Sequence, residues 1–171
     1  VDRIEAGGFD NLSILANAPL SFDGDVALRM GQSLRLYAGT YAHAENAPAG
    51  TNVSLSAPYV RLAGTTLTAP DPLTMPRANW AAGPSQQPTD GMFSVLADLI
   101  DVRDDVGFGT HAELDLRTSR YTVDRRGFDA AELTSRCDIR MLGGSLPTTR
   151  NLALAAEQIY AAPRLGRLRI S

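Results

Sequence analysis

Apolar and polar residues alternate along most of the chain, in short runs that Gly, Asn or Pro interrupt. The clearest case is the segment 52–64, in which every second residue is apolar on each side of a short bend. A period of two is typical of a β-strand that buries one face. The segment therefore predicts two short strands that point five residues toward a common core: Val53, Leu55, Ala57, Val60 and Leu62.

The same five offsets recur elsewhere in the chain, which indicates an internal repeat. The close copies are Phe93, Val95, Ala97, Ile100 and Val102, and Leu152, Leu154, Ala156, Ile159 and Ala161. The looser copies run from Leu12 to Phe22, from Val26 to Leu36, from Ala131 to Met141 and, with more distortion, from Ala112 to Val123. No stretch of useful length has the 3.6-residue period of an amphipathic helix.

Most copies start about 20 residues apart, which is a spacing typical of solenoid repeats. Loop inserts near 41–51 and 69–91 account for two longer steps, whereas the short step from Leu12 to Val26 has no evident explanation. We expect residues 1–171 to form a single all-β segment, a right-handed parallel β-helix (β-solenoid) with about 20 residues per coil. An antiparallel β-sandwich is the alternative, but it does not require apolar residues at fixed offsets.

Several phrases of the sequence resemble a known protein family. They are the opening Gly7-Gly8-Phe9-Asp10-Asn11-Leu12-Ser13-Ile14, the segments 22–28, 33–39 and 53–62, and Ile100-Asp101-Val102. Together they resemble the filamentous-haemagglutinin-like family of large exoproteins, which leave Gram-negative bacteria by two-partner secretion. The resemblance extends over nearly the whole chain.

The resemblance implies a long β-helical shaft that is secreted or held at the outer-membrane surface and serves in adhesion or contact between cells. It also implies two kinds of partner: a host or neighbouring-cell surface receptor or glycan, and the outer-membrane transporter of the parent protein. No phrase like Asn-Pro-Asn-Gly-Ile, which the secretion domain of this family carries, is present. We therefore expect a segment of a larger protein, outside its secretion domain.

Composition narrows the classes of function. Hydrophobic residues make up 44% and charged residues 20% of the chain, which is too apolar for a disordered protein. The formal net charge is -3, so no nucleic-acid partner is expected, since such proteins carry a basic surface. No glycine-rich phosphate loop precedes a helix, and no calcium-loop motif occurs, so we expect no nucleotide, cofactor or metal.

Catalytic arrangements are weak, and we expect a non-catalytic protein. The densest acidic group is Asp98, Asp101, Asp104 and Asp105, and carboxylate clusters serve polysaccharide lyases and hydrolases built on β-helices. Asp101 alternates with Ile100 and Val102 and is therefore expected to face away from the core. A β-helical carbohydrate-active enzyme or a carbohydrate-binding module stays the alternative, and a segment of a contact-dependent toxin system would share the fold.

The insert 69–91 contains the residues that the repeat leaves unexplained. It is rich in proline and holds the sole tryptophan, Trp80, beside Asn79 and near Arg77. An exposed Trp next to polar donors can stack on a sugar ring or anchor a protein partner. The alternative is that Trp80 folds back and pins the insert to the flank of the solenoid. These three residues are the candidate binding site.

The substitution Trp80→Ala distinguishes these two roles. If Trp80 contacts a receptor, the variant should lose binding to cells at an unchanged melting temperature. If Trp80 pins the insert, the melting temperature should fall and cell binding should stay as before. Thermal denaturation and a cell-binding assay on the same preparation measure both quantities.

Overall fold

The computed structural model is all-β, as the alternating pattern predicts, and every described element is a strand. It describes residues 4, 7–16, 19–44, 47–64, 91–109, 111–115, 120–124, 127–144, 146 and 151–161, without side chains for 111–115 and 120–124. The strands are β1 (Asn11–Leu15), β2 (Leu20–Phe22), β3 (Val26–Arg29), β4 (Ser33–Tyr37), β5 (Thr40–His43), β6 (Val53–Ser56), β7 (Tyr59–Ala63), β8 (Met92–Arg103), β9 (Gly107–Phe108), β10 (His111–Asp115), β11 (Arg120–Asp124), β12 (Ala130–Leu142), β13 (Asn151–Ala155) and β14 (Gln158–Ala161).

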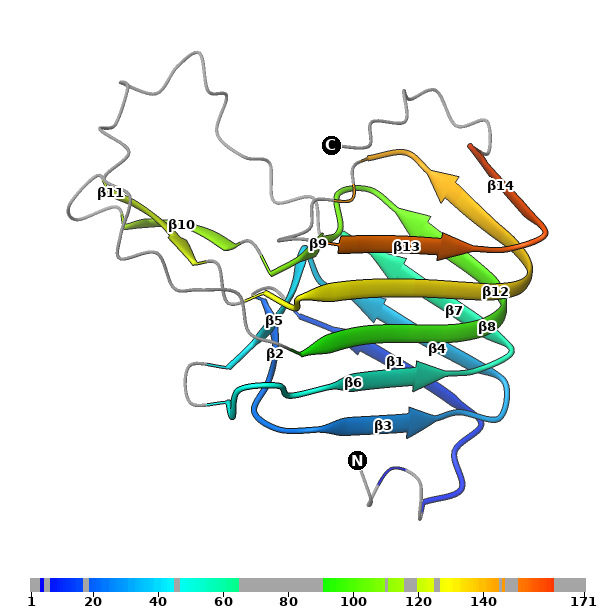
Figure 1. The fold of residues 1–171 in the computed structure, drawn as a ribbon. Helices are drawn as coiled ribbons and strands as arrows, with labels where there is room; N and C mark the ends of the chain where they lie inside the picture. The colour runs from blue at the N-terminus through cyan, green and yellow to red at the C-terminus, as the bar shows by residue number, and fades with distance from the viewer. Residues whose placement is uncertain are drawn as a thin grey trace.

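Most strands are parallel and lie side by side in three rows (Figure 1). The first row is β3–β6–β8–β12–β13, and the second row is β1–β4–β7–β8–β12–β14. The long strands β8 and β12 belong to both rows, because each passes through the bend between them. The third row, β2–β5–β9, is a separate parallel sheet.

The chain visits these rows in a fixed order. β1, β2 and β3 lie in the second, third and first rows, and β4, β5 and β6 repeat that order. After β7 in the second row, β8 occupies the first and second rows and β9 the third. From β1 to β6, each passage through the three rows therefore adds one strand to each of them.

The register confirms the alignment predicted from the apolar offsets. Apolar residues pair in two lines across the strands, Val26–Val53–Phe93–Ala131–Leu152 and Leu34–Val60–Ile100–Ile139–Ile159. Neighbouring bends are also hydrogen-bonded to each other. The carbonyl oxygen of Pro58 accepts hydrogen bonds from the N–H groups of Asp98 (3.0 Å) and Leu99 (3.1 Å). In-register parallel pairing places each apolar side chain beside its counterpart, which builds one continuous core.

Two of the looser copies were predicted wrongly. Residues 111–115 and 120–124 form an antiparallel pair, β10 with β11, and Phe93 pairs directly with Ala131 across this interval. A hairpin strand has the same period of two as a parallel strand, so alternation does not reveal its partner. The copy at Leu12 was aligned to the wrong row: Leu12 pairs with Leu34 in the second row, which explains its short distance from Val26.

The expected insert near 41–51 begins as a strand of the third row. Tyr41 and His43 lie in β5 and are buried, although the sequence suggested a loop there. The short row β2–β5–β9 has few alternating residues per strand, so its periodicity was too brief to recognise. The second expected insert, 69–91, lies outside the described residues except for Gly91.

Aromatic side chains fill the core where the third row faces the first. The ring of Phe93 lies 5.1 Å from Phe108, 5.3 Å from Phe128 and 5.4 Å from Tyr41, measured between ring centroids. The Tyr41 hydroxyl donates a hydrogen bond to the Leu36 carbonyl oxygen (3.2 Å), and burial raises the pKa of Tyr41. Since such clusters bury large apolar areas, Phe93 is central to the stability of the stack.

Substitution of Phe93 tests this role. Phe93→Ala should lower the free energy of unfolding by about 3–5 kcal/mol, because it leaves a cavity among the rings of Tyr41, Phe108 and Phe128. The neighbouring Met92 is 41% exposed, so Met92→Ala should change it by no more than about 0.5 kcal/mol. Urea denaturation measures both values, and equal effects would contradict the assigned core.

Candidate functional site

Charged side chains occupy one line across the outer face of the second row. Arg61 of β7, Asp101 of β8 and Arg140 of β12 are direct register partners. Each lies between two core residues of its strand and therefore points away from the core. Because neighbouring strands are about 4.8 Å apart, this register brings a carboxylate between two guanidinium groups.

Asp101 receives four hydrogen bonds at this position. Its carboxylate oxygens accept bonds from Arg140 Nε (2.6 Å) and Arg140 Nη2 (3.0 Å), which form a bidentate pair. They also accept bonds from Arg61 Nη2 (3.2 Å) and the Tyr59 hydroxyl (2.7 Å). Asp101 is consequently 0% exposed. The residue points outward, as the alternation predicts, but long side chains from both neighbouring strands cover it.

The electrostatics of this group follow from its partners. Burial acts to raise the pKa of Asp101, but hydrogen bonds from Arg140, Tyr59 and Arg61 outweigh it and hold the pKa below its ordinary value. Burial and the hydrogen bond to Asp101 raise the pKa of Tyr59. A carboxylate that is ionised and saturated with donors is a poor general acid and a weak base. The arrangement therefore cross-links three strands rather than moving protons.

Further aromatic and basic side chains extend the same face. The guanidinium carbons of Arg35 and Arg61 each lie 5.8 Å from the centroid of the Tyr59 ring. At the end of the row, the Tyr160 hydroxyl donates to Asp138 (3.2 Å). We call Tyr59, Arg61, Asp101 and Arg140 the outer clamp, because together they join β7, β8 and β12.

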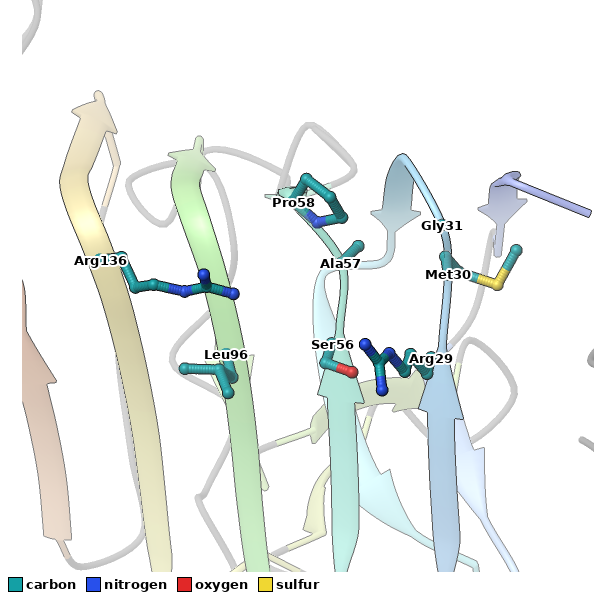
Figure 2. A pocket seen from close by; sticks show the side chains of 8 residues that line it. All are labelled: Arg29, Met30, Gly31, Ser56, Ala57, Pro58, Leu96 and Arg136. Carbon is teal, nitrogen blue, oxygen red and sulfur yellow. The ribbon is translucent and has the colours of Figure 1, made fainter.

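A pocket of about 330 Å³ lies on the outer face of the first row, beside the bend. Its lining includes Arg29, Met30, Ser56, Pro58, Leu96 and Arg136. Figure 2 shows the guanidinium groups of Arg29 and Arg136 pointing toward one another across Ser56 and Leu96. The pocket therefore combines an apolar floor with two cationic groups, which is an arrangement suited to a small anion with an apolar body.

The predicted binding residues Trp80, Arg77 and Asn79 lie outside the described residues, so the structure places none of them. Sequence reasoning missed the outer clamp and the pocket. A signal for the clamp was present, since Arg61, Asp101 and Arg140 each stand between the last two core offsets of their copies. No comparable signal marks the pocket, because it depends on how far two flexible side chains reach across neighbouring strands.

Other reactive groups of the described part are dispersed. His43 is buried against Phe128, with the ring centroids 4.3 Å apart, and burial lowers its pKa despite a backbone hydrogen bond with Thr51. Cys137 is exposed in β12. In the part of the chain that the structure describes, no three His, Cys, Asp or Glu side chains are grouped to hold a metal ion, and no helix there is long and apolar enough to cross a membrane.

The outer clamp predicts a pH dependence of stability. Asp101 has a lower pKa in the folded than in the unfolded chain, so its stabilisation is fully present above its unfolded-state pKa and is lost as the pH falls through its folded-state pKa. Asp101→Asn should lower the free energy of unfolding at pH 7 by about 3 kcal/mol, because two part-buried arginines lose the buried carboxylate that pairs with them.

The Asp101→Asn variant should also lose less stability than the wild type between pH 5 and pH 2, since the titrating group is gone. Asp23→Asn is the control, because Asp23 is exposed in a turn and should behave as the wild type. Urea denaturation at several pH values measures the difference. If Asp101→Asn loses as much stability at low pH as the wild type does, Asp101 is not the source of that loss.

Comparison of the chain with protein-family models, with curated proteins and with solved structures found no match. The likeness to filamentous-haemagglutinin-like exoproteins is therefore a hypothesis that depends on the sequence phrases quoted above.

Proposed function

We propose that the chain is a segment of a right-handed parallel β-helix. The support is the order in which the chain passes through the three parallel rows, adding one strand to each row in each of the two passages from β1 to β6. Successive parallel strands joined by such crossovers are right-handed in almost all proteins. Within this fold, the core residues of one coil pack on those of the next, as in other solenoids.

We further propose that this segment is a structural and adhesive part of a larger filamentous-haemagglutinin-like protein, secreted or exposed at the surface of a Gram-negative bacterium. It would mediate adhesion or cell-cell contact without catalysis. The observation that carries this proposal is the use of side chains on the two faces of the strands. The inward positions of the stack build a continuous core, and the most buried outward carboxylate, Asp101, serves to cross-link strands.

A β-helical lyase or hydrolase is the competing hypothesis. Such an enzyme needs a carboxylate that can accept or donate a proton, or several that can hold a cation. Asp101 has arginine partners on both neighbouring strands, and its pKa is lowered by their hydrogen bonds against the effect of burial. These contacts favour the adhesive hypothesis. A carbohydrate-binding module is compatible with the adhesive hypothesis, and the pocket between Arg29 and Arg136 favours such a module.

An adhesion assay tests the proposed function. Beads coated with the purified chain should bind epithelial or bacterial cells more than beads coated with the destabilised Phe93→Ala variant, whose folded population is reduced. The same chain should release no reducing ends from a panel of acidic and neutral polysaccharides. Depolymerisation of any of these polysaccharides would overturn the non-catalytic assignment, and equal retention of both bead types would overturn the adhesive one.

A further inference from the structure

The pocket beside the bend owes its shape to an irregularity in β12. The pairing of β12 with β8 shifts between Ser135 and Asp138, so β12 carries an extra residue there. A bulge of this kind re-aims the side chains next to it. Arg136 lies in the bulge, and its guanidinium group extends back over β8 toward the pocket (Figure 2).

Arg136 reaches this position with only a weak restraint. Its Nε lies 3.1 Å from the Asp98 carboxylate, in an ion pair whose side chains are 73% and 44% exposed. Exposed pairs of this kind contribute about 0–1 kcal/mol. A ligand carboxylate can therefore compete for Arg136 at little cost.

Recognition in this pocket has to come from side chains. The strands β3, β6, β8 and β12 pair with one another in register, which uses their backbone N–H and C=O groups in the sheet. The groups that remain are two guanidinium groups, the Ser56 hydroxyl and an apolar floor that includes Leu96, which is 48% exposed. This set offers bidentate donors to a carboxylate, a partner for a hydroxyl and a surface for the apolar face of a ring.

We propose that this pocket binds one carboxylated sugar ring, such as a uronate or sialate unit of an acidic glycan. Its volume of about 330 Å³ fits a single ring, at the lower end of the range for ligand pockets. The carboxylate lies between Arg29 and Arg136, and the ring packs on Leu96 and Pro58. This inference deepens the proposed adhesive function and rests on it, since it names the class of glycan that an adhesin of this kind would bind.

Two other anionic partners fit the pocket less well. A peptide C-terminus is usually held by converging backbone N–H groups, which the in-register sheet does not offer here. A single-stranded nucleic acid needs aromatic rings for stacking and a basic surface, whereas the described residues that line the pocket include no aromatic one and the chain carries a net charge of -3.

Titration calorimetry with matched probes tests the proposal. Trigalacturonate and sialyllactose should bind, and their neutral counterparts, the methyl ester of trigalacturonate and lactose, should bind at least about tenfold more weakly. Arg29→Gln and Arg136→Gln should each weaken binding of the acidic probes about tenfold, which corresponds to about 1.4 kcal/mol. Circular dichroism and the melting temperature establish that each variant is folded.

Two further variants sharpen the test. Arg103→Gln is the matched control, because Arg103 is also a part-exposed arginine paired with a neighbouring aspartate, Asp104, but lies outside the pocket. It should leave binding unchanged. Asp98→Asn should strengthen binding severalfold, because it releases Arg136 from its ion pair. A purely structural role of Arg136 would instead leave binding unaffected in both Asp98→Asn and Arg136→Gln.

The proposal is overturned if neutral and acidic probes bind equally, if the double variant R29Q/R136Q binds as the wild type, or if a peptide with a free C-terminus binds more tightly than both sugars. Its failure is distinguishable from failure of the adhesive function. If beads coated with R29Q/R136Q still adhere to cells, the pocket is not the adhesive site, but the adhesive function stands. If the chain binds the acidic sugars but its beads do not adhere to cells, the pocket proposal stands and the adhesive function fails.

Discussion

The structure depends on one constraint, the in-register pairing of parallel backbones. Each strand within a row satisfies its N–H and C=O groups on strands from other parts of the chain, and these pairings join residues that lie about one repeat or more apart in sequence. This pairing places like residues beside one another, so the apolar positions of successive strands merge into the continuous core. The aromatic cluster around Phe93 fills the wider space where the third row faces the first. Burial of these side chains supplies most of the driving force for folding.

The same constraint creates a difficulty on the outer face, because repeated arginines would be stacked on one another. Asp101 relieves it at one position, since it separates Arg61 from Arg140 in the paired register and places a negative charge between the two guanidinium groups. A buried charged group contributes little net stability, because its desolvation offsets much of the attraction. Its stronger effect is on alignment. A slip of one residue would carry Asp101 into the core and Ile100 out of it, which a carboxylate cannot tolerate. The outer clamp therefore fixes the register of β8 between β7 and β12.

Much of the first and second rows could be predicted from the sequence, because Val53, Phe93 and Leu152 recur with the same apolar companions and a parallel stack makes such companions neighbours. The third row could not be predicted, since β2, β5 and β9 are too short to establish a period. The hairpin β10–β11 was misassigned because a strand pattern does not specify its partner. The burial of Asp101 depends on arginines from two other strands, and no local pattern reports a contact of that kind. The pocket likewise arises from a bulge, which the spacing of the Ala131 copy reflects without revealing its consequence.

The pairing of Phe93 with Ala131 has a consequence for how such a chain can evolve. Between β8 and β12 lie β9, which joins the third row, and the hairpin β10–β11, which forms a sheet of its own, and neither interrupts the pairing of β8 with β12. Closing a flexible connection becomes only about 0.6 kcal/mol more costly with each doubling of its length. New sequence can therefore be inserted between these strands, or removed, while the neighbouring strands keep their partners. The stack thus separates the part of the protein under selection for folding from segments that are free to diversify.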